Sequence, residues 1–323
     1  MKQIRLRSYY VTLGIAILAC AAVYAGICLI QLGAPTGLTG FTDAYALAQE
    51  RIATRSGKKL LYAGGSSGFY GVRCEELSRQ IGRPAVNFGL HGGLGLRYLM
   101  DRVAAAAGPG DVIVIGPEWE TYRGPRFGEY ACDYIMSRRP RYLESLPLFL
   151  TTQVFVAAGP QRIFTGFVSL LTNGRRTAQN TDISGAVNAY GDRVITAADI
   201  AQQSVFAKNL TADVPQWQPP PPELAQDVEA FAKACREKSV RVVAVFPPLC
   251  LGGNADNAMI AAAEKGMRHF WSDRGIRVLG TFGNASYERG DAFDTPYHLV
   301  AAAAMVHTSK LAQLLKDSGV LAD

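Results

Sequence analysis

The sequence is poor in the residues and spacings that mark several common classes of protein. No two of its six cysteines have CxxC spacing and its four histidines form no ligand cluster, so we expect no bound metal. The net charge of +6 includes no long block of lysine or arginine, which argues against a nucleic-acid partner. The glycine-rich stretch 89–95 lacks the GxGxxG spacing of a dinucleotide-binding turn, so we expect no cofactor there or elsewhere.

Charge is absent from one long segment near the N-terminus. No charged residue occurs between Arg7 and Asp43, and residues 9–32 are almost entirely apolar. About 20 apolar residues are enough for a helix to cross a bilayer. Because basic residues precede this segment and no acidic residue does, the positive-inside rule places residues 1–8 in the cytoplasm and everything after residue 32 on the other side.

We therefore predict an uncleaved signal anchor at residues 9–32, with the lipid bilayer as a partner. A cleaved signal peptide is the alternative, but its apolar region usually spans only about 7–15 residues. Cys20 ends a faint lipoprotein-type cleavage box, in which Leu18 stands where a smaller residue is usual. Beyond the anchor, an oxidising compartment would permit disulfides, and three pairings are open among Cys74, Cys132, Cys235 and Cys250.

Short apolar runs alternate with amphipathic stretches after the anchor. A linker and lead-in helix occupy residues 33–57, and the main domain covers residues 58–323. Strands that alternate with helical patterns indicate a parallel sheet with helices on both faces. We therefore predict an α/β domain of three α/β/α layers with a five-stranded, mainly parallel sheet. The expected strands are 59–63, 84–88, 111–115, 240–246 and 275–279.

One insertion interrupts this alternation. Residues 124–222 separate the third expected strand from the fourth. Loops of this length inside a compact domain are usually functional or form a subdomain. We expect a partly helical cap beside the site.

The candidate catalytic residues lie mainly in the segments that follow the expected strands. Ser66 follows the first strand after two glycines, where helix amides can stabilise negative charge. A serine nucleophile needs a base, and His298 is the candidate, with Asp294 placed to orient its imidazole. His91, in the loop after the second strand, either touches substrate or has a structural role. The simpler alternative is that Ser66 only caps a helix and His298 only begins one.

The order of these blocks resembles the SGNH (GDSL-like) hydrolase superfamily over most of residues 60–315, apart from the insertion. Gly64-Gly65-Ser66 is similar to its serine block, Asn87-Phe88-Gly89 to its glycine block, and the segment from Asp294 to His298 to its last block. The resemblance implies a flavodoxin-like fold. It also places Asn87 and Gly89 in the oxyanion or substrate-binding site, with the Gly89 amide as an oxyanion donor.

The segments GGSSGFYG, NFGLHGG, PGDVIVIGPEWE and FDTPYHL are similar to a membrane-anchored bacterial branch of this superfamily. That branch is related to extracytoplasmic proteins that acylate cell-surface polymers. The resemblance implies a single-pass protein of the bacterial inner (cytoplasmic) membrane with a periplasmic C-terminal domain. It further implies an extracytoplasmic glycan as substrate and a multi-spanning membrane acyltransferase as acyl donor.

Two positions depart from the superfamily pattern. The usual asparagine of the third block falls at Glu118, and an ionised carboxylate would repel an oxyanion. Either burial protonates Glu118, or it binds something else, or the backbone amides of Ser66 and Gly89 form the oxyanion hole. The acid also lies four residues before His298 rather than three, and Thr295 occupies the usual acid position.

The resulting prediction is a membrane-anchored acyltransferase or esterase that acts on an extracytoplasmic polysaccharide through a Ser-His-Asp site. The alternative is a catalytically inactive binding or assembly subunit of a polysaccharide export or modification system. Glu118 is the residue that favours this alternative.

Overall fold

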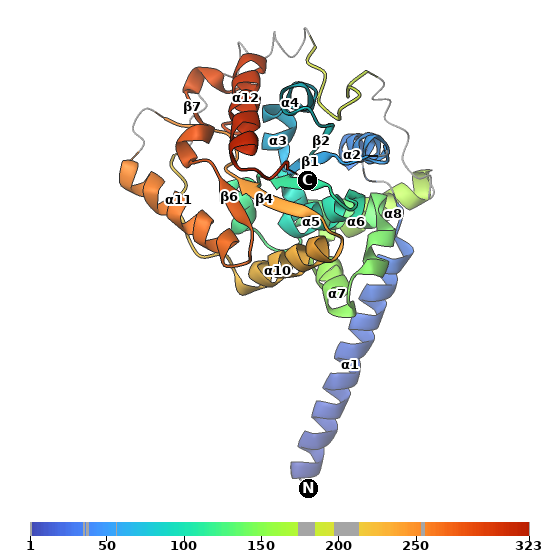
Figure 1. Cartoon of the computed structure of the whole chain (residues 1–323). Coiled ribbons are helices and arrows are strands. Elements are labelled where there is room, and N and C mark those ends of the chain that lie inside the picture. The colour runs from blue at the N-terminus through green and yellow to red at the C-terminus, as the bar shows by residue number, and fades with distance from the viewer. Residues whose placement is uncertain are drawn as a thin grey trace. The chain divides into compact units, whose positions relative to one another are not determined.

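The chain forms two compact units in the computed structural model (Figure 1). The membrane-helix unit comprises Met1–Gly40 and Glu129–Thr181, and the sheet unit comprises Phe41–Gly128 and Asp182–Asp323. The expected insertion 124–222 is thus divided between the units, and its residues 174–184 and 197–212 lie outside the described part of the chain. The structure describes residues 2–34, 36, 39–55, 57–173, 185–196, 213–252 and 256–322.

The membrane-helix unit contains the apolar N-terminal helix. Helix α1 (Lys2–Ile30) includes a span, Leu6–Ile30, that is long and apolar enough to cross a membrane, with a mean hydropathy of 2.5. This confirms the predicted apolar helix. Its other described helices include α6 (Glu129–Arg138), α7 (Leu148–Ala157) and α8 (Pro160–Asn173).

The sheet unit contains the predicted five-stranded parallel sheet, in the order β2-β1-β3-β4-β6. Each strand is a short, largely buried apolar run, as the sequence pattern predicts. The strands are β1 (Leu60–Gly64), β2 (Ala85–Gly89), β3 (Val112–Ile115), β4 (Arg241–Val245) and β6 (Arg277–Leu279). A second, two-stranded sheet pairs β5 (Leu249–Cys250) with β7 (Ser286–Tyr287).

Successive strand side chains pack into separate hydrophobic cores because they point to opposite faces of the sheet. Leu61 and Ile113 belong to the core that contains α5 (Gly95–Ala106), α10 (Pro222–Glu237) and α11 (Asn257–Ser272).

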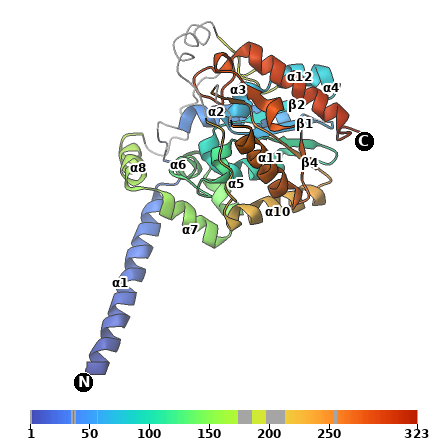
Figure 2. The same cartoon turned by 90° about the vertical axis from the view of Figure 1, so that its left-hand side faces the viewer.

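Leu60 and Val112 belong to the other core, with α4 (Cys74–Ile81) and α12 (Ala301–Asp317), which lie side by side in Figure 2. The remaining helices of the sheet unit include α2 (Gly40–Ala53) and α3 (Ser66–Gly71).

The loop 185–196 covers the edge of β2. The Asn87 amide donates to the Tyr190 carbonyl at 2.8 Å. Gly191 permits this approach, since it has φ +81° and a Cβ there would lie 2.7 Å from the Asn87 carbonyl oxygen. The buried Asp192 carboxylate then accepts hydrogen bonds from the first two amides of α4, Cys74 at 2.7 Å and Glu75 at 2.9 Å. One loop therefore joins the sheet edge to a helix N-terminus.

We expect Asp192→Ala to destabilise the sheet unit by about 2 kcal/mol, because it leaves two helix amides without their acceptor. Urea unfolding of the detergent-solubilised chain can be followed by tryptophan fluorescence, since Trp119, Trp217 and Trp271 all belong to the sheet unit. Asp273→Ala, which removes a half-exposed carboxylate paired with His269, is the control and should change stability by less than about 0.5 kcal/mol. Equal losses in the two variants would contradict the structural role of Asp192.

Candidate active site

The candidate site lies where the sheet order changes direction. From β1 the chain continues to the edge strand β2, whereas from β3 it continues to β4 on the opposite side. In open α/β sheets, ligands bind at such a switch point, beyond the carboxyl ends of the strands. Ser66 begins α3 directly after β1, and Glu118 follows β3. The connectivity thus brings the two residues to the same edge of the sheet.

Glu118 is the central contact of the site. Its side chain is buried, and its Oε1 accepts hydrogen bonds from Ser66 Oγ at 3.2 Å and from the Ser67 amide at 2.7 Å. Its Oε2 is buried without a hydrogen-bond partner among the described residues. A Cβ at Gly65 would lie 1.7 Å from this oxygen, and one at Gly92 would lie 2.4 Å from it. These two loops therefore need glycine because the Glu118 carboxyl packs against their backbone.

Burial raises the pKa of Glu118. The Ser67 amide, positive charge on His298 and the Ser66 hydroxyl act in the opposite direction and only partly offset the burial. In a neutral carboxyl group, the carbonyl oxygen accepts hydrogen bonds while the other oxygen carries the proton. Two donors on Oε1 are compatible with that form, whereas a proton on Oε2 would have no acceptor among the described residues. Protonation by burial is one of the three alternatives left open by the sequence.

His298 and Asp294 form the pair that the sequence predicts. The distance from His298 Nδ1 to Asp294 Oδ1 is 2.5 Å. A tight turn makes this contact: the His298 amide donates to the Thr295 carbonyl at 3.2 Å, and the Phe293 amide donates to the His298 carbonyl at 2.7 Å. The four-residue spacing is therefore compatible with an acid–histidine contact. Asp294 rather than Thr295 supplies it, and a proton on Nδ1 leaves Nε2 as the acceptor.

Helix α3 contains both Ser66 and Tyr70, the residue that contacts His298. Ser66 and Tyr70 are four residues apart on this helix, so they lie on the same face about one 5.4 Å turn apart. The Tyr70 ring stacks on the His298 imidazole, with ring centroids 4.0 Å apart and an interplanar angle of 6°. Within the described residues no hydrogen bond joins Ser66 to His298. The Ser66 hydroxyl donates instead to Glu118.

The two glycine-block residues have scaffold contacts. Asn87 is fully buried, and its Nδ2 donates to the carbonyls of Gly68 at 3.2 Å and Val72 at 3.0 Å. Its Oδ1 accepts the Gly89 amide at 2.8 Å. In this structure the Gly89 amide is thus engaged by Asn87, and its service as an oxyanion donor stays a prediction.

His91 lies close enough to His298 for the two side chains to interact electrostatically. Partial removal of the ring from water lowers the pKa of His91, although the residue is exposed, and positive charge on His298 lowers it further. Its Nδ1 accepts the Gly93 amide at 3.0 Å, which holds the imidazole in a fixed orientation in the loop. Both roles left open by the sequence, substrate contact and loop structure, remain compatible with this position.

Sequence reasoning missed two residues of this site. Tyr70 supports the His298 ring, and its four-residue spacing from Ser66 is the signal that would have found it. The second residue is Arg193, whose guanidinium group lies over the Tyr70 ring, 4.7 Å from its centroid. Arg193 belongs to the expected insertion, and no local pattern connects it with Ser66.

No metal ligand set is present among the described residues, since no group of three or more His, Cys, Asp or Glu side chains there is arranged to hold an ion. All six cysteines lie in the described part of the chain and all are free thiols. None of the three disulfide pairings left open by the sequence is formed.

No protein-family model matches the chain, and no curated protein sequence is significantly similar to it.

We expect Glu118→Gln to stabilise the protein at pH 8, because the amide keeps the size of the side chain but cannot ionise. A raised pKa means that the folded state binds the proton more tightly than the unfolded state. Wild-type stability should therefore fall as pH rises from about 4.5, the ordinary value, through the folded-state pKa. The advantage of the variant should shrink toward pH 4 in urea unfolding.

Glu237→Gln, at an exposed position of α10, is the control and should give no comparable gain. A Glu118→Gln variant that is less stable than wild type at pH 8 would show instead that the ionised carboxylate is favoured in the fold.

Proposed function

We propose that the sheet unit has the three-layer, flavodoxin-like arrangement of the SGNH hydrolases. The strand order β2-β1-β3-β4-β6 supports this, because it corresponds to the order 2-1-3-4-5 of flavodoxin-like sheets. The separate hydrophobic cores on the two sets of strand side chains also support it.

The proposed chemistry is acyl transfer through a covalent intermediate. Ser66 Oγ attacks the carbonyl carbon of an acyl ester while His298 Nε2 takes the hydroxyl proton, and Asp294 stabilises the imidazolium. The tetrahedral intermediate collapses to an acyl-serine, and His298 returns the proton to the departing alcohol. A sugar hydroxyl or water then attacks the acyl-serine while His298 Nε2 takes its proton. The bond from the acyl carbon to Ser66 Oγ breaks and His298 returns the proton to Oγ, which gives transfer or hydrolysis respectively.

Before this attack, Ser66 must exchange its hydrogen bond. Its hydroxyl donates to Glu118 Oε1 in the structure, so a rotation about the Cα–Cβ bond has to redirect it toward His298. We propose that neutral Glu118 acts as a donor to the oxyanion, in place of the asparagine of the superfamily. A carboxylic acid kept neutral by its surroundings can stabilise an oxyanion in this way.

The proposed setting is a single-pass protein of the bacterial inner membrane whose sheet unit is periplasmic. The apolar span of α1 and the basic tail before it support this orientation. The SGNH resemblance supports an extracytoplasmic polysaccharide as the acyl acceptor or ester substrate. A multi-spanning acyltransferase would supply the acyl group across the membrane.

The observation that carries the proposal is the stacking of Tyr70 on His298. It places an imidazole already paired with Asp294 on the face of the helix that begins with Ser66. A structural helix cap would require neither the paired acid nor the stacked ring.

A second candidate function is a non-catalytic binding subunit of a polysaccharide export or modification system. One observation favours it: Glu118 already binds the Ser66 hydroxyl and the Ser67 amide, and Asn87 binds the Gly89 amide. Groups that would act on a substrate are thus engaged within the protein.

Labelling with a serine-reactive fluorophosphonate separates the two functions. We expect wild-type protein to form a covalent adduct at Ser66, located by peptide mass spectrometry, and Ser66→Ala to form none. Ser67→Ala is the matched control, because Ser67 neighbours the nucleophile and its buried hydroxyl has no hydrogen-bond partner among the described residues. A folded wild-type protein that does not label would favour the binding subunit.

We expect His298→Ala to reduce hydrolysis of an activated acyl ester by at least about 100-fold, since it removes the general base. His269→Ala, at an exposed position of α11, should retain wild-type turnover. Ester hydrolysis by the purified chain, measured from released alcohol, tests this directly. Unchanged turnover in His298→Ala would exclude the imidazole as the base.

A further inference from the structure

Helices α7 and α8 expose an unusual amount of apolar surface for helices outside the N-terminal span. They meet at a bend of 88°, and together they are long and apolar enough for a broken or re-entrant membrane span. Between Glu144 and Arg175 the sequence has a single charged residue, Arg162. The large apolar side chains that are exposed are Leu148, Phe149, Val156, Phe164, Phe167, Val168 and Leu171.

The bend between the two helices lies against α1. The Tyr24 hydroxyl is 2.9 Å from the Phe155 carbonyl oxygen and 2.8 Å from the Ala158 carbonyl oxygen, so it donates to the backbone where α7 ends. Figures 1 and 2 both show α7 and α8 beside the C-terminal part of α1. Tyr24 is six residues before Ile30, the end of the apolar span, which corresponds to about 9 Å along the helix.

This contact satisfies a requirement that is specific to membranes. A broken helix leaves backbone carbonyls without intrahelical partners, and water is not available to them in the hydrocarbon region. Non-helical backbone is tolerated at that depth only where protein groups satisfy it. The Phe155 carbonyl already accepts the Ala158 amide at 3.2 Å. The single proton of the Tyr24 hydroxyl therefore supplies a partner to the Ala158 carbonyl from within the apolar span of α1.

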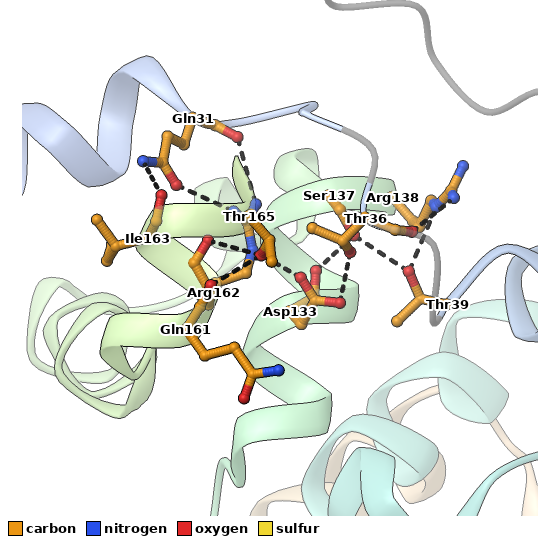
Figure 3. A network of polar contacts seen from close by, with 10 residues as sticks. All are labelled: Gln31, Thr36, Thr39, Asp133, Ser137, Arg138, Gln161, Arg162, Ile163 and Thr165. Atoms are coloured by element: carbon orange, nitrogen blue, oxygen red, sulfur yellow. Dashed lines mark hydrogen bonds and ion pairs between the residues drawn. The ribbon is translucent and has the colours of Figure 1, made fainter. Parts of the chain in front are cut away.

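The only charge of the two helices is neutralised within the unit (Figure 3). Arg162 is buried, with its Nε 2.6 Å from Asp133 Oδ1 and its Nη1 3.0 Å from Gln31 Oε1. Gln31 Nε2 in turn donates to the Ile163 carbonyl at 2.9 Å. Since Gln31 directly follows α1, this network lies at the end of the apolar span, where polar groups are tolerated.

We propose that α7 and α8 form a bent hairpin inserted into the same bilayer leaflet as the C-terminal end of α1, with lipid acyl chains covering its apolar face. Continuity with the apolar span of α1 identifies lipid as the occupant, because the bend of the hairpin is held at a depth within that span. The inference rests on the proposed membrane anchoring by α1 but not on the proposed serine chemistry.

Spin labels on the full-length chain in phosphatidylcholine/phosphatidylglycerol vesicles test this insertion. In a Cys20→Ala background, which removes the one exposed cysteine, labels are attached at Val156→Cys on α7 and Phe164→Cys on α8. Ile17→Cys, in the middle of α1, is the lipid reference, and Glu144→Cys, at an exposed position before α7, is the water reference.

We expect the ratio of oxygen accessibility to nickel-chelate accessibility at positions 156 and 164 to match that at 17 and to exceed that at 144 several-fold. A water-like ratio at 156 and 164 would overturn the hairpin proposal while leaving the anchor intact. A water-like ratio at 17 would overturn both. Protection from oxygen and nickel together, with dipolar broadening between labels, would identify a second copy as the occupant and also overturn it.

Photolabelling of the unmodified protein provides a measurement that needs no substitution. A lipid-soluble aryl diazirine should modify the peptide covering α7 and α8 as well as α1, whereas peptides of α10 should remain unmodified. Absence of label from α7 and α8 would contradict insertion. Neither result depends on fluorophosphonate reactivity, so failure of the hairpin and failure of the proposed chemistry are distinguishable.

Discussion

Insertion of the Glu118 carboxyl group, from the segment after β3, between the segments that follow β1 and β2 is the interaction on which the candidate site depends. The group receives the Ser66 hydroxyl and the Ser67 amide and packs against two glycines. Removing a carboxyl from water disfavours its ionised form, which explains why its pKa rises despite two donors. The same burial that organises the loops therefore favours the neutral form of the carboxyl group that contacts the serine.

The histidine is held by different forces. Asp294 determines the orientation of its Nδ1 side, and the Tyr70 ring covers one face of the imidazole. Because Tyr70 and Ser66 belong to one short helix, movement of α3 would shift the serine and the aromatic support together. The site thus combines the buried Glu118 carboxyl, which is hydrogen-bonded to the serine, with a separately positioned acid–histidine pair.

The membrane-helix unit follows the same rule for polar groups in apolar surroundings. The Tyr24 hydroxyl donates to the backbone at the end of α7, and Arg162 is paired with Asp133 and Gln31. Exposed apolar surface is concentrated on α1, α7 and α8. That distribution is expected for a chain in which one unit contacts lipid and the other does not.

The sequence by itself determined the apolar helix, the five parallel strands and the pairing of His298 with Asp294, because these follow from local hydrophobic patterns and short spacing. It also identified Glu118 as the departure from the SGNH pattern. Only the tertiary structure decided that the Gly89 amide is occupied by Asn87 and that Tyr70 supports His298. It likewise assigned part of the insertion to the unit of α1. The Asn87–Gly89 contact depends on the orientation of one side chain, and the Tyr70–His298 contact joins residues more than 100 positions apart. Hydrophobic periodicity predicts neither side-chain orientation nor long-range contacts.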